Sequence, residues 1–168
     1  KKKQIQYEKD HDHLTGLLLY PSFKREVTLV INNNNYNHLY AAVMVDLDSF
    51  KHINDTYGHV AGDELICAAT DCMKNSFNEY GKVYRIGGDE FAVIITEDIN
   101  EFENMIHRFK SNITNWHGEF VDSMTVSYGW VFSTEGNWGS IYEISKAADE
   151  RMYESKERFY NESGVNRR

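Results

Sequence analysis

The sequence has very few cysteines, only two among 168 residues. Cys67 and Cys72 lie five positions apart in a stretch that we expect to be helical, so the two thiols do not share one helix face. This spacing matches neither a disulfide framework nor a zinc site. We therefore expect both cysteines to be small side chains of the hydrophobic core.

The sequence also lacks long apolar runs and a surplus of positive charge. No run reaches the roughly 18 apolar residues that span a bilayer, and no signal peptide opens the chain, so we expect a cytoplasmic domain. A membrane anchor would then belong to a region further upstream. The formal net charge of −8 argues against nucleic acid as a partner, because that binding needs excess Lys and Arg. An acidic chain still binds a nucleotide where metal ions and a few cations gather.

The remaining composition is that of one globular domain. Hydrophobic residues make up 41% of the chain, and 168 residues are enough to bury a sizeable core. Residues 1–10 are polar, with apolar side chains only at Ile5 and Tyr7, too few for an independently stable helix. We interpret them as the end of a connector helix from an upstream regulatory region, and residues 11–168 as the domain itself.

The spacing of apolar residues predicts the elements of this domain. In chain order they are a helix that Pro21 opens, a loop over 32–35, a buried strand over 39–47, an irregular stretch over 50–63, a helix from about 62, a hairpin over 83–95, a helix over 102–116, a strand over 124–132 and a helix from 141. Gly129 suggests a bulge in its strand, and Asp63 suits a helix cap. This order predicts an α/β sandwich with a central mixed sheet of about five strands flanked by helices.

The predicted hairpin carries two acids beside its turn. Gly87 and Gly88 join the two strands, as glycine tolerates the positive φ that tight turns need. Asp89 and Glu90 follow directly, and carboxylates are suitable ligands for Mg²⁺ or Ca²⁺ where glycines let a ligand approach the backbone. The alternative is an ordinary hairpin with a solvated acidic tip.

The buried strand over 39–47 ends in a second group of acids. Asp46 and Asp48 stand at its carboxyl end, where open α/β sheets tend to place ligands. A polar strand end without function is the alternative. If the two acid-bearing strand ends lie side by side, Asp46 and Asp89 can share a divalent cation.

Three motifs then occur in one order. They read DHLTGL over 12–17, DLDSFKHIND over 46–55 with YGH at 57–59 and GD at 62–63, and RIGGDEF over 85–91. With them the chain resembles the GGDEF-type diguanylate cyclase catalytic domain from Asp12 to about Asn161. The resemblance implies a fold similar to class III nucleotide cyclases and polymerase palm domains. It also implies a reaction in which two GTP molecules, one on each subunit of a two-fold homodimer, form cyclic di-GMP and two pyrophosphates.

The resemblance further implies roles for single residues. Two Mg²⁺ ions per GTP, replaceable by Mn²⁺, would be held by Asp46, the Leu47 carbonyl, Asp89 and Glu90. The guanine edge would be bound by Asn54 and Asp63, and the triphosphate by Lys51 and Lys156. Arg158 is the candidate to substitute for the phosphate-binding family arginine that is missing at Tyr160. Asp89 and Glu90 would be the catalytic acids, with Glu90 the candidate acceptor of the 3′-hydroxyl proton. A glutamate alone is a weak base at neutral pH, so metal ions would do most of that step.

The chain departs from the family pattern in three places. Tyr160 stands where an arginine is usual near the end of the last helix, and Leu19 and Tyr20 replace an Asn-Arg pair after the opening motif. Asn78 and Gly81 occupy the places of the Arg and Asp of the product-inhibition site. We therefore predict no high-affinity product site at Asn78 and Gly81.

Two other functions compete with an active cyclase. One is a catalytically silent GTP-binding regulatory module, against which the intact acids of the motifs argue. The other is a cyclase that makes a mixed purine dinucleotide, against which Asp63 argues, because it is the acid expected to select guanine.

Overall fold

The computed structural model describes residues 1–32 and 39–164 and contains one mixed sheet. Its strand order is β1-β3-β4-β2-β5, with β1 parallel to β3 and the other neighbours antiparallel. The strands are β1 (Leu18–Leu19), β2 (Ala41–Leu47), β3 (Gly81–Arg85), β4 (Glu90–Ile95) and β5 (Val126–Phe132). The predicted mixed sheet of about five strands is confirmed.

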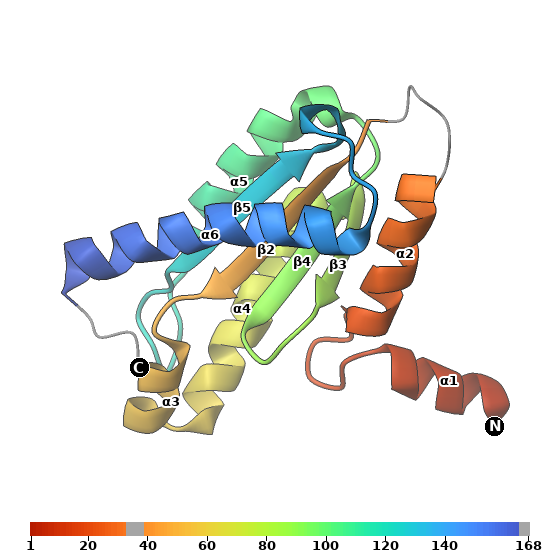
Figure 1. Ribbon diagram of the computed structural model, residues 1–168. Coiled ribbons are helices and arrows are strands. Elements are labelled where there is room, and N and C mark those ends of the chain that lie inside the picture. Colours follow the sequence, from red (N-terminus) through yellow and green to blue (C-terminus); the bar gives the residue numbers. More distant parts are fainter. Residues whose placement is uncertain (33–38, 165–168) are drawn as a thin grey trace.

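Helices cover both faces of this sheet (Figure 1). They are α1 (Lys2–Asp10), α2 (Tyr20–Asn32), α3 (Phe50–Tyr57), α4 (His59–Phe77), α5 (Phe102–Thr114) and α6 (Ile141–Ser163), with short 3-10 helices over Ile99–Glu101 and Ser133–Glu135. Helices α4 and α5 pack on one face, and α2 and α6 on the other. Of the predicted loop over 32–35, Asn32 is the last residue of α2, and residues 33–35 lie outside the described residues.

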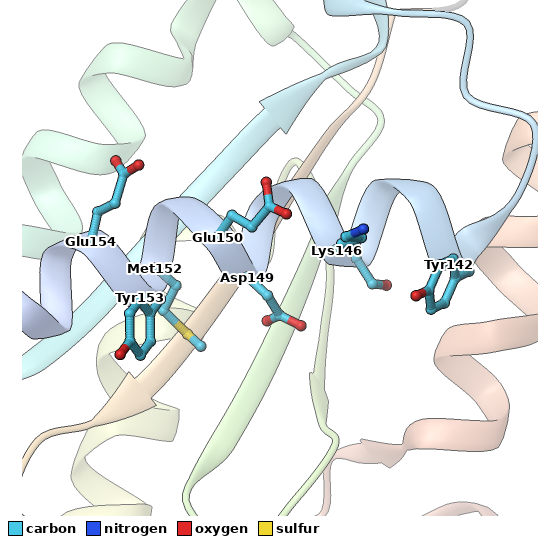
Figure 2. Close-up of a pocket in the computed structure, with 8 residues that line it drawn as sticks. Tyr142, Lys146, Asp149, Glu150, Met152, Tyr153 and Glu154 are labelled. Carbon is cyan, nitrogen blue, oxygen red and sulfur yellow. The ribbon is translucent and has the colours of Figure 1, made fainter. Parts of the chain in front are cut away.

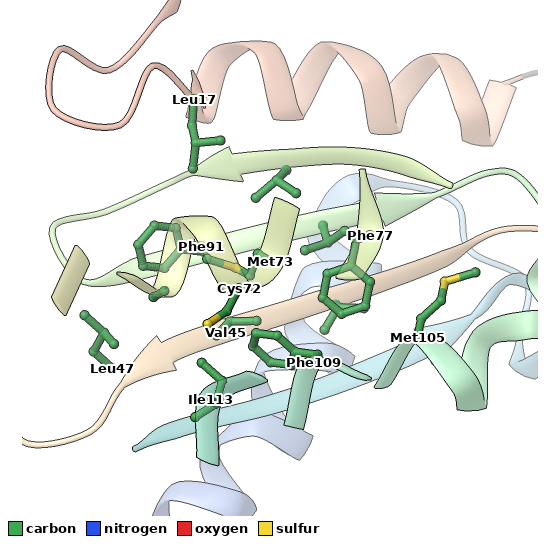
Figure 3. Close-up of a cluster of buried hydrophobic side chains, with 14 of the residues drawn as sticks. Leu17, Val45, Leu47, Cys72, Met73, Phe77, Phe91, Met105, Phe109 and Ile113 are labelled. Carbon is green, nitrogen blue, oxygen red and sulfur yellow. The ribbon is translucent and has the colours of Figure 1, made fainter. Parts of the chain in front are cut away.

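Strand β2 lies inside the sheet between β4 and β5, and all seven of its residues are buried. Side chains alternate between the two faces of a strand. Val43 and Val45 therefore enter the core beneath α4 and α5, where Figure 3 shows Val45. Ala42 and Met44 enter the core beneath α2 and α6. Asp46 continues the second series, so its carboxylate lies on the face that α6 covers.

The stretch predicted to be irregular, 50–63, is helical instead. Helix α3 ends at Tyr57, and α4 begins at His59 after Gly58, whose φ of 89° breaks the helical path. Asp63 therefore lies inside α4, and the prediction that it caps the helix is wrong. The stretch was interpreted as irregular because it contains Gly58 and Gly62, although Phe50 and Ile53 of α3 lie at helical spacing and pack against the core.

Two predictions about glycines are also wrong. Among described glycines, only Gly16, Gly58 and Gly164 have positive φ, so the hairpin turn does not need it at Gly87 or Gly88. Gly129 forms no bulge, since its pairing with Met44 continues the regular register.

The N-terminal helix and the cysteines complete the comparison with the sequence. Helix α1 covers nine of the first ten residues, and none of its side chains is buried, so the connector role stays a prediction. Cys72 is buried in α4 as expected, whereas Cys67 is only half-buried. Within residues 1–32 and 39–164, no helix has the length and apolarity to cross a membrane.

Candidate metal and nucleotide site

The site is built around the end of β2, where Asp46 meets α6. One carboxylate oxygen of Asp46, Oδ2, accepts a hydrogen bond from Lys156 Nζ at 2.5 Å. The other oxygen, Oδ1, is buried without a hydrogen-bond partner. Burial raises the pKa of Asp46 to about 7, with a further rise from the Asp89 carboxylate and a partial offset by Lys156. A buried, unpartnered carboxylate oxygen of this kind suits a cation.

The acids of the hairpin lie beside this strand end. Glu90 is the cross-strand partner of Asp46, and the Leu47 amide donates to the Asp89 carbonyl at 3.1 Å. The Asp89 carboxylate is close enough to Asp46 to shift its pKa. The two acid-bearing strand ends therefore lie side by side, as the sequence predicted.

A third acid, Asp48, lies just beyond Asp46 and faces β5. Its Oδ1 accepts from the Ser127 hydroxyl at 2.6 Å, and its Oδ2 is buried without a partner. Burial raises the pKa of Asp48. The carboxylates of Asp46 and Asp48 thus concentrate negative charge at the end of β2. Among the contacts described, only Lys156 and the Ser127 hydroxyl offset it.

The loop from β2 to α3 presents backbone amides next to these acids. Ser49 is the N-cap of α3 and adopts a left-handed conformation, with φ 57°. Its amide donates to the Tyr160 hydroxyl at 3.2 Å. Lys51 is exposed in the first turn of α3. Because the first amides of a helix have no partner within it, this end of α3 favours an anion.

The two residues predicted to bind guanine come together across α3 and α4. A Cβ added to Gly62 would lie 2.0 Å from Asn54 Oδ1, so the amide of Asn54 rests directly on Gly62. Asn54 is therefore half-buried against Gly62, and the residue after this glycine, Asp63, is exposed.

The opening motif is tied to the hairpin by an ion pair. Arg85 Nη1 donates to both carboxylate oxygens of Asp12 at 3.0 Å, and its Nη2 donates to the Gly88 carbonyl at 2.7 Å. Asp12 also accepts from the amide and hydroxyl of Thr15. A Cβ at Gly87 would lie 3.2 Å from the Cβ of Glu90, a tight contact that Glu90 would have to relieve by a small shift.

Asp149 of α6 approaches the same hairpin from the helix side. Burial raises its pKa, and the charge of Glu90 adds to the rise. Asp149 lines an open pocket along α6 together with Tyr142, Lys146 and Met152 (Figure 2). Glu90 therefore has an acidic neighbour that sequence reasoning did not identify.

Some predicted residues lie elsewhere. Arg158 lines a groove with Lys110 of α5 and Tyr128 of β5, whereas Lys156 turns toward Asp46. Asn78 follows the last turn of α4, and Gly81 begins β3, where an added Cβ would lie 1.8 Å from the Ile94 carbonyl oxygen. No side chain fits at Gly81 without moving backbone.

The acidic side chains at the end of β2 fit one kind of divalent-cation site and not another. In the part of the chain that the structure describes, no three His, Cys, Asp or Glu side chains converge as a complete metal cage. Mg²⁺ is commonly bound by one or two carboxylates together with phosphate oxygens of a substrate. Asp46 and Asp89, with the unpartnered Oδ1 of Asp46, fit this kind of site.

Two contacts of the site have no signal in the sequence. Tyr160 and Ser49 are 111 positions apart, and only the path of α6 over the sheet brings them together. Asp48 and Ser127 meet because β5 pairs with β2. In the sequence, the only indication that Asp48 belongs to the site was its position two residues after Asp46, at the end of the buried strand.

A mixed five-stranded sheet with acids at the end of the buried strand β2 and on the neighbouring β3–β4 hairpin defines a palm-like nucleotide cyclase domain. The chain belongs to the GGDEF family, since the family model described as "Diguanylate cyclase, GGDEF domain" matches residues 9–162. Members of this cyclase family generally use divalent metal ions. Activity of this member is a separate question, because some GGDEF proteins are inactive.

Curated relatives support the same assignment. The chain is 31% identical to diguanylate cyclase DgcN and 30% identical to diguanylate cyclase DgcM, both from Escherichia coli K12, over 87% and 92% of its length. It spans 36% and 38% of those proteins. An uncharacterized membrane protein of Staphylococcus aureus strain USA300 is 28% identical over 89% of the chain, which spans 44% of that protein.

Solved structures share the fold. The coiled coil and GGDEF domain of DgcB from Caulobacter crescentus, in complex with c-di-GMP, has a TM-score of 0.83 at 22% identity and covers 93% of this chain and 85% of its own. The GGDEF domain of TpbB from Pseudomonas aeruginosa has a TM-score of 0.78 at 26% identity and covers 88% of this chain and 89% of its own. The predicted palm-like fold is thereby confirmed.

Proposed function

We propose that this chain is the catalytic domain of an active diguanylate cyclase that condenses two GTP molecules into cyclic di-GMP and two pyrophosphates. The observation that carries the proposal is the meeting of Asp46 and Asp89 at one strand end, with Asp46 Oδ1 buried and unpartnered. Family membership over residues 9–162 supports the same chemistry.

Asp46, the Leu47 carbonyl, Asp89 and Glu90 would hold the Mg²⁺ ions, two per GTP, with Mn²⁺ as a substitute. Bound Mg²⁺ supplies charge neutralisation and a more acidic 3′-hydroxyl. Glu90 is exposed at the rim of the hairpin, where it is available to accept the proton of that hydroxyl. Phosphoryl transfer otherwise depends on in-line positioning more than on covalent help.

The nucleotide would lie across the loop after β2. Asn54 and Asp63 would bind the guanine edge, because a carboxylate accepts from N1–H and the 2-amino group together, which adenine does not offer. Lys51 and Lys156 would bind the triphosphate as point charges. Lys156 would then exchange its bond to Asp46 for bonds to phosphate. Arg158 stays a weaker candidate, because it lies in the groove beside α5.

Each domain would hold one GTP, and each bound GTP would attack the GTP on the other domain. Turnover therefore needs a homodimer with two-fold symmetry. We further propose a cytoplasmic location within a longer protein, with α1 as the connector to a sensor or dimerisation region, which a membrane anchor can accompany. The chain spans little more than a third of DgcN and DgcM, which is consistent with additional regions.

A catalytically silent GTP-binding module is the second candidate. The observation that favours it is Tyr160, which stands in place of a phosphate-binding arginine and contacts the Ser49 amide. A silent module would bind GTP at Asn54 and Asp63 and release it unchanged.

The deciding experiment uses the chain fused to a dimeric coiled coil and incubated with GTP, ATP and Mg²⁺. We expect cyclic di-GMP as the product, identified by mass. Asp89→Asn and Glu90→Gln should each lower turnover by at least about 100-fold, because they remove groups at the reacting atoms. Glu97→Gln, an exposed residue beyond the far end of β4, serves as the control and should leave turnover unchanged.

Each contrary result has a defined meaning. GTP binding without product would select the silent module. A mixed guanine and adenine product would show that Asn54 and Asp63 do not select the base. Full turnover by the Glu90 variant would remove that residue from the mechanism.

A further inference from the structure

Two residues of α6 close over the loop that follows β2. Lys156 donates to Asp46, and the Tyr160 hydroxyl accepts from the Ser49 amide at 3.2 Å. Residues four apart lie on the same face of a helix, so both contacts come from one face of α6. Lys156 supplies a positive charge to a carboxylate there, and Tyr160 supplies an oxygen to an amide.

The backbone at Ser49 is shaped to hold an oxygen acceptor. Ser49 has left-handed angles, φ 57° and ψ 25°, and Phe50 begins the right-handed turn of α3. A left-handed residue beside a right-handed one directs successive N–H groups toward one point, and such concave nests bind anions. The amide of Ser49 is the first of this series, and the Tyr160 oxygen already lies on it.

We propose that Tyr160 is a built-in competitor of the nucleotide, whose hydroxyl oxygen occupies the Ser49 amide that a phosphate oxygen would otherwise take. The inference rests on the function proposed above, because a triphosphate bound to Lys51 and Lys156 brings its oxygens to this loop. A charged phosphate oxygen forms a stronger hydrogen bond than a neutral hydroxyl. The phosphate therefore displaces Tyr160, and the lost Tyr160 contact lowers the affinity for the nucleotide.

The role follows from the residue type at this position. An arginine, which is usual in the family, has no acceptor atom and would attract the phosphate. Tyrosine instead offers the amide an internal partner. Tyr160 is thus a residue that sets affinity, and it takes no part in the bond-making step.

The test compares the chain with its Tyr160→Phe variant, which keeps the ring and removes only the oxygen. The probes are 3′-deoxy-GTP with Mg²⁺, which carries the triphosphate but lacks the attacking hydroxyl, and guanosine, which lacks phosphates. By titration calorimetry, we expect the variant to bind 3′-deoxy-GTP about two- to tenfold more tightly, the worth of one neutral hydrogen bond. Its affinity for guanosine should not change.

The matched control is Tyr142→Phe. Tyr142 is on the same helix, is 71% exposed and lies toward its other end (Figure 2), so loss of its hydroxyl should leave both affinities unchanged. A second measurement follows the Ser49 amide by hydrogen exchange in NMR without nucleotide. Exchange should be faster in Tyr160→Phe and unaltered in Tyr142→Phe.

The outcomes separate this inference from the proposed function. Equal or weaker binding of 3′-deoxy-GTP by Tyr160→Phe would overturn the competition and leave the cyclase proposal intact. A gain in affinity for guanosine of the same size would also overturn it, because that gain does not involve phosphates. Failure of both proteins to bind 3′-deoxy-GTP would overturn the proposed function and the competition together.

Discussion

The position of the Asn54 side chain depends on Gly62, a glycine that lies against it. The amide oxygen of Asn54 occupies the space that a Cβ on Gly62 would need, and Gly62 is buried within α4. The sequence motif contains both residues, but their contact is visible only when α3 folds back against α4. The glycine thereby places the amide beside Asp63.

Gly62→Ala should displace the Asn54 amide while the fold persists, because the obstructing atom is the end of a flexible side chain. We expect guanosine affinity to fall by about tenfold, as one or two hydrogen bonds are lost. Binding of inorganic pyrophosphate with Mg²⁺ should not change. Titration calorimetry measures both, and Gly136→Ala, in an exposed loop, is the control. Unchanged guanosine affinity would exclude Asn54 from base binding.

Tyr160 and Asp48 show how a single side chain escapes sequence reasoning. The motif indicated that an arginine was missing, and nothing in the residue pattern indicated that a hydroxyl would contact an amide 111 positions away. Asp48 was noted as a strand-end acid, yet its partner Ser127 comes from a strand far along the chain.

Helix α6 carries the cation and the hydroxyl of the site, so its seating on the sheet decides their positions. It packs against β5 at Gly129, where an added Cβ would lie 2.3 Å from the Met152 amide nitrogen and 2.6 Å from the Ala148 carbonyl oxygen. Both obstacles are helix backbone. The glycine therefore permits a close approach of helix to strand.

Gly129→Ala should push α6 away from β5, because backbone atoms cannot rotate aside as a side chain does. We expect a loss of about 1–3 kcal/mol in the free energy of unfolding, the usual cost of overpacking. Urea denaturation measures it. Gly139→Ala is the control, since its nearest neighbour is a side-chain oxygen of Glu143 at 3.6 Å. A stability equal to that of the parent chain would show that α6 has room to shift.

Elements were predicted well where their apolar residues are fully buried and less well where those residues are only partly buried. Helices α5 and α6 and strands β2 and β4 follow the apolar pattern closely. Helix α3 does carry apolar residues at helical spacing, because Phe50 and Ile53 pack against the core, although none of its residues is fully buried. Gly58 also separated α3 from α4 in a way that made the whole stretch resemble a loop.

The opening turn and the hairpin are joined across the molecule by Asp12 and Arg85, whose side chains are 16% and 14% exposed. Burial alone would raise the pKa of Asp12. The hydrogen bonds from Thr15 and Arg85 outweigh burial, and the pKa lies below its ordinary value of 3.8. A carboxylate with a lowered pKa in the folded state stabilises the fold at neutral pH, and this stability is lost as the pH falls.

Asp12→Asn should therefore lower the free energy of unfolding at pH 7 by about 1–3 kcal/mol, the range for hydrogen bonds to a charged group. The difference between the two proteins should narrow as the pH falls from 3.8 toward the lower pKa of folded Asp12, because Asp12 takes up its proton first in the unfolded chain. Urea denaturation across pH measures both. Asp10→Asn, in a more exposed pair with Arg25, should change stability by less than about 0.5 kcal/mol. A gap that stays constant with pH would contradict the role of charge at Asp12.

The sequence by itself determined the fold class, the fully buried strand β2 and the acids at its end. Alternation of side chains and ordered motifs are local properties, so residues such as Asp46 and Asp89 could be identified without coordinates. Tertiary structure alone decided which face of β2 Asp46 occupies beneath α6, which cation it meets, and that Tyr160 reaches Ser49. Those outcomes depend on how helices cross the sheet, and contacts between residues more than 100 positions apart leave no local pattern in a single chain.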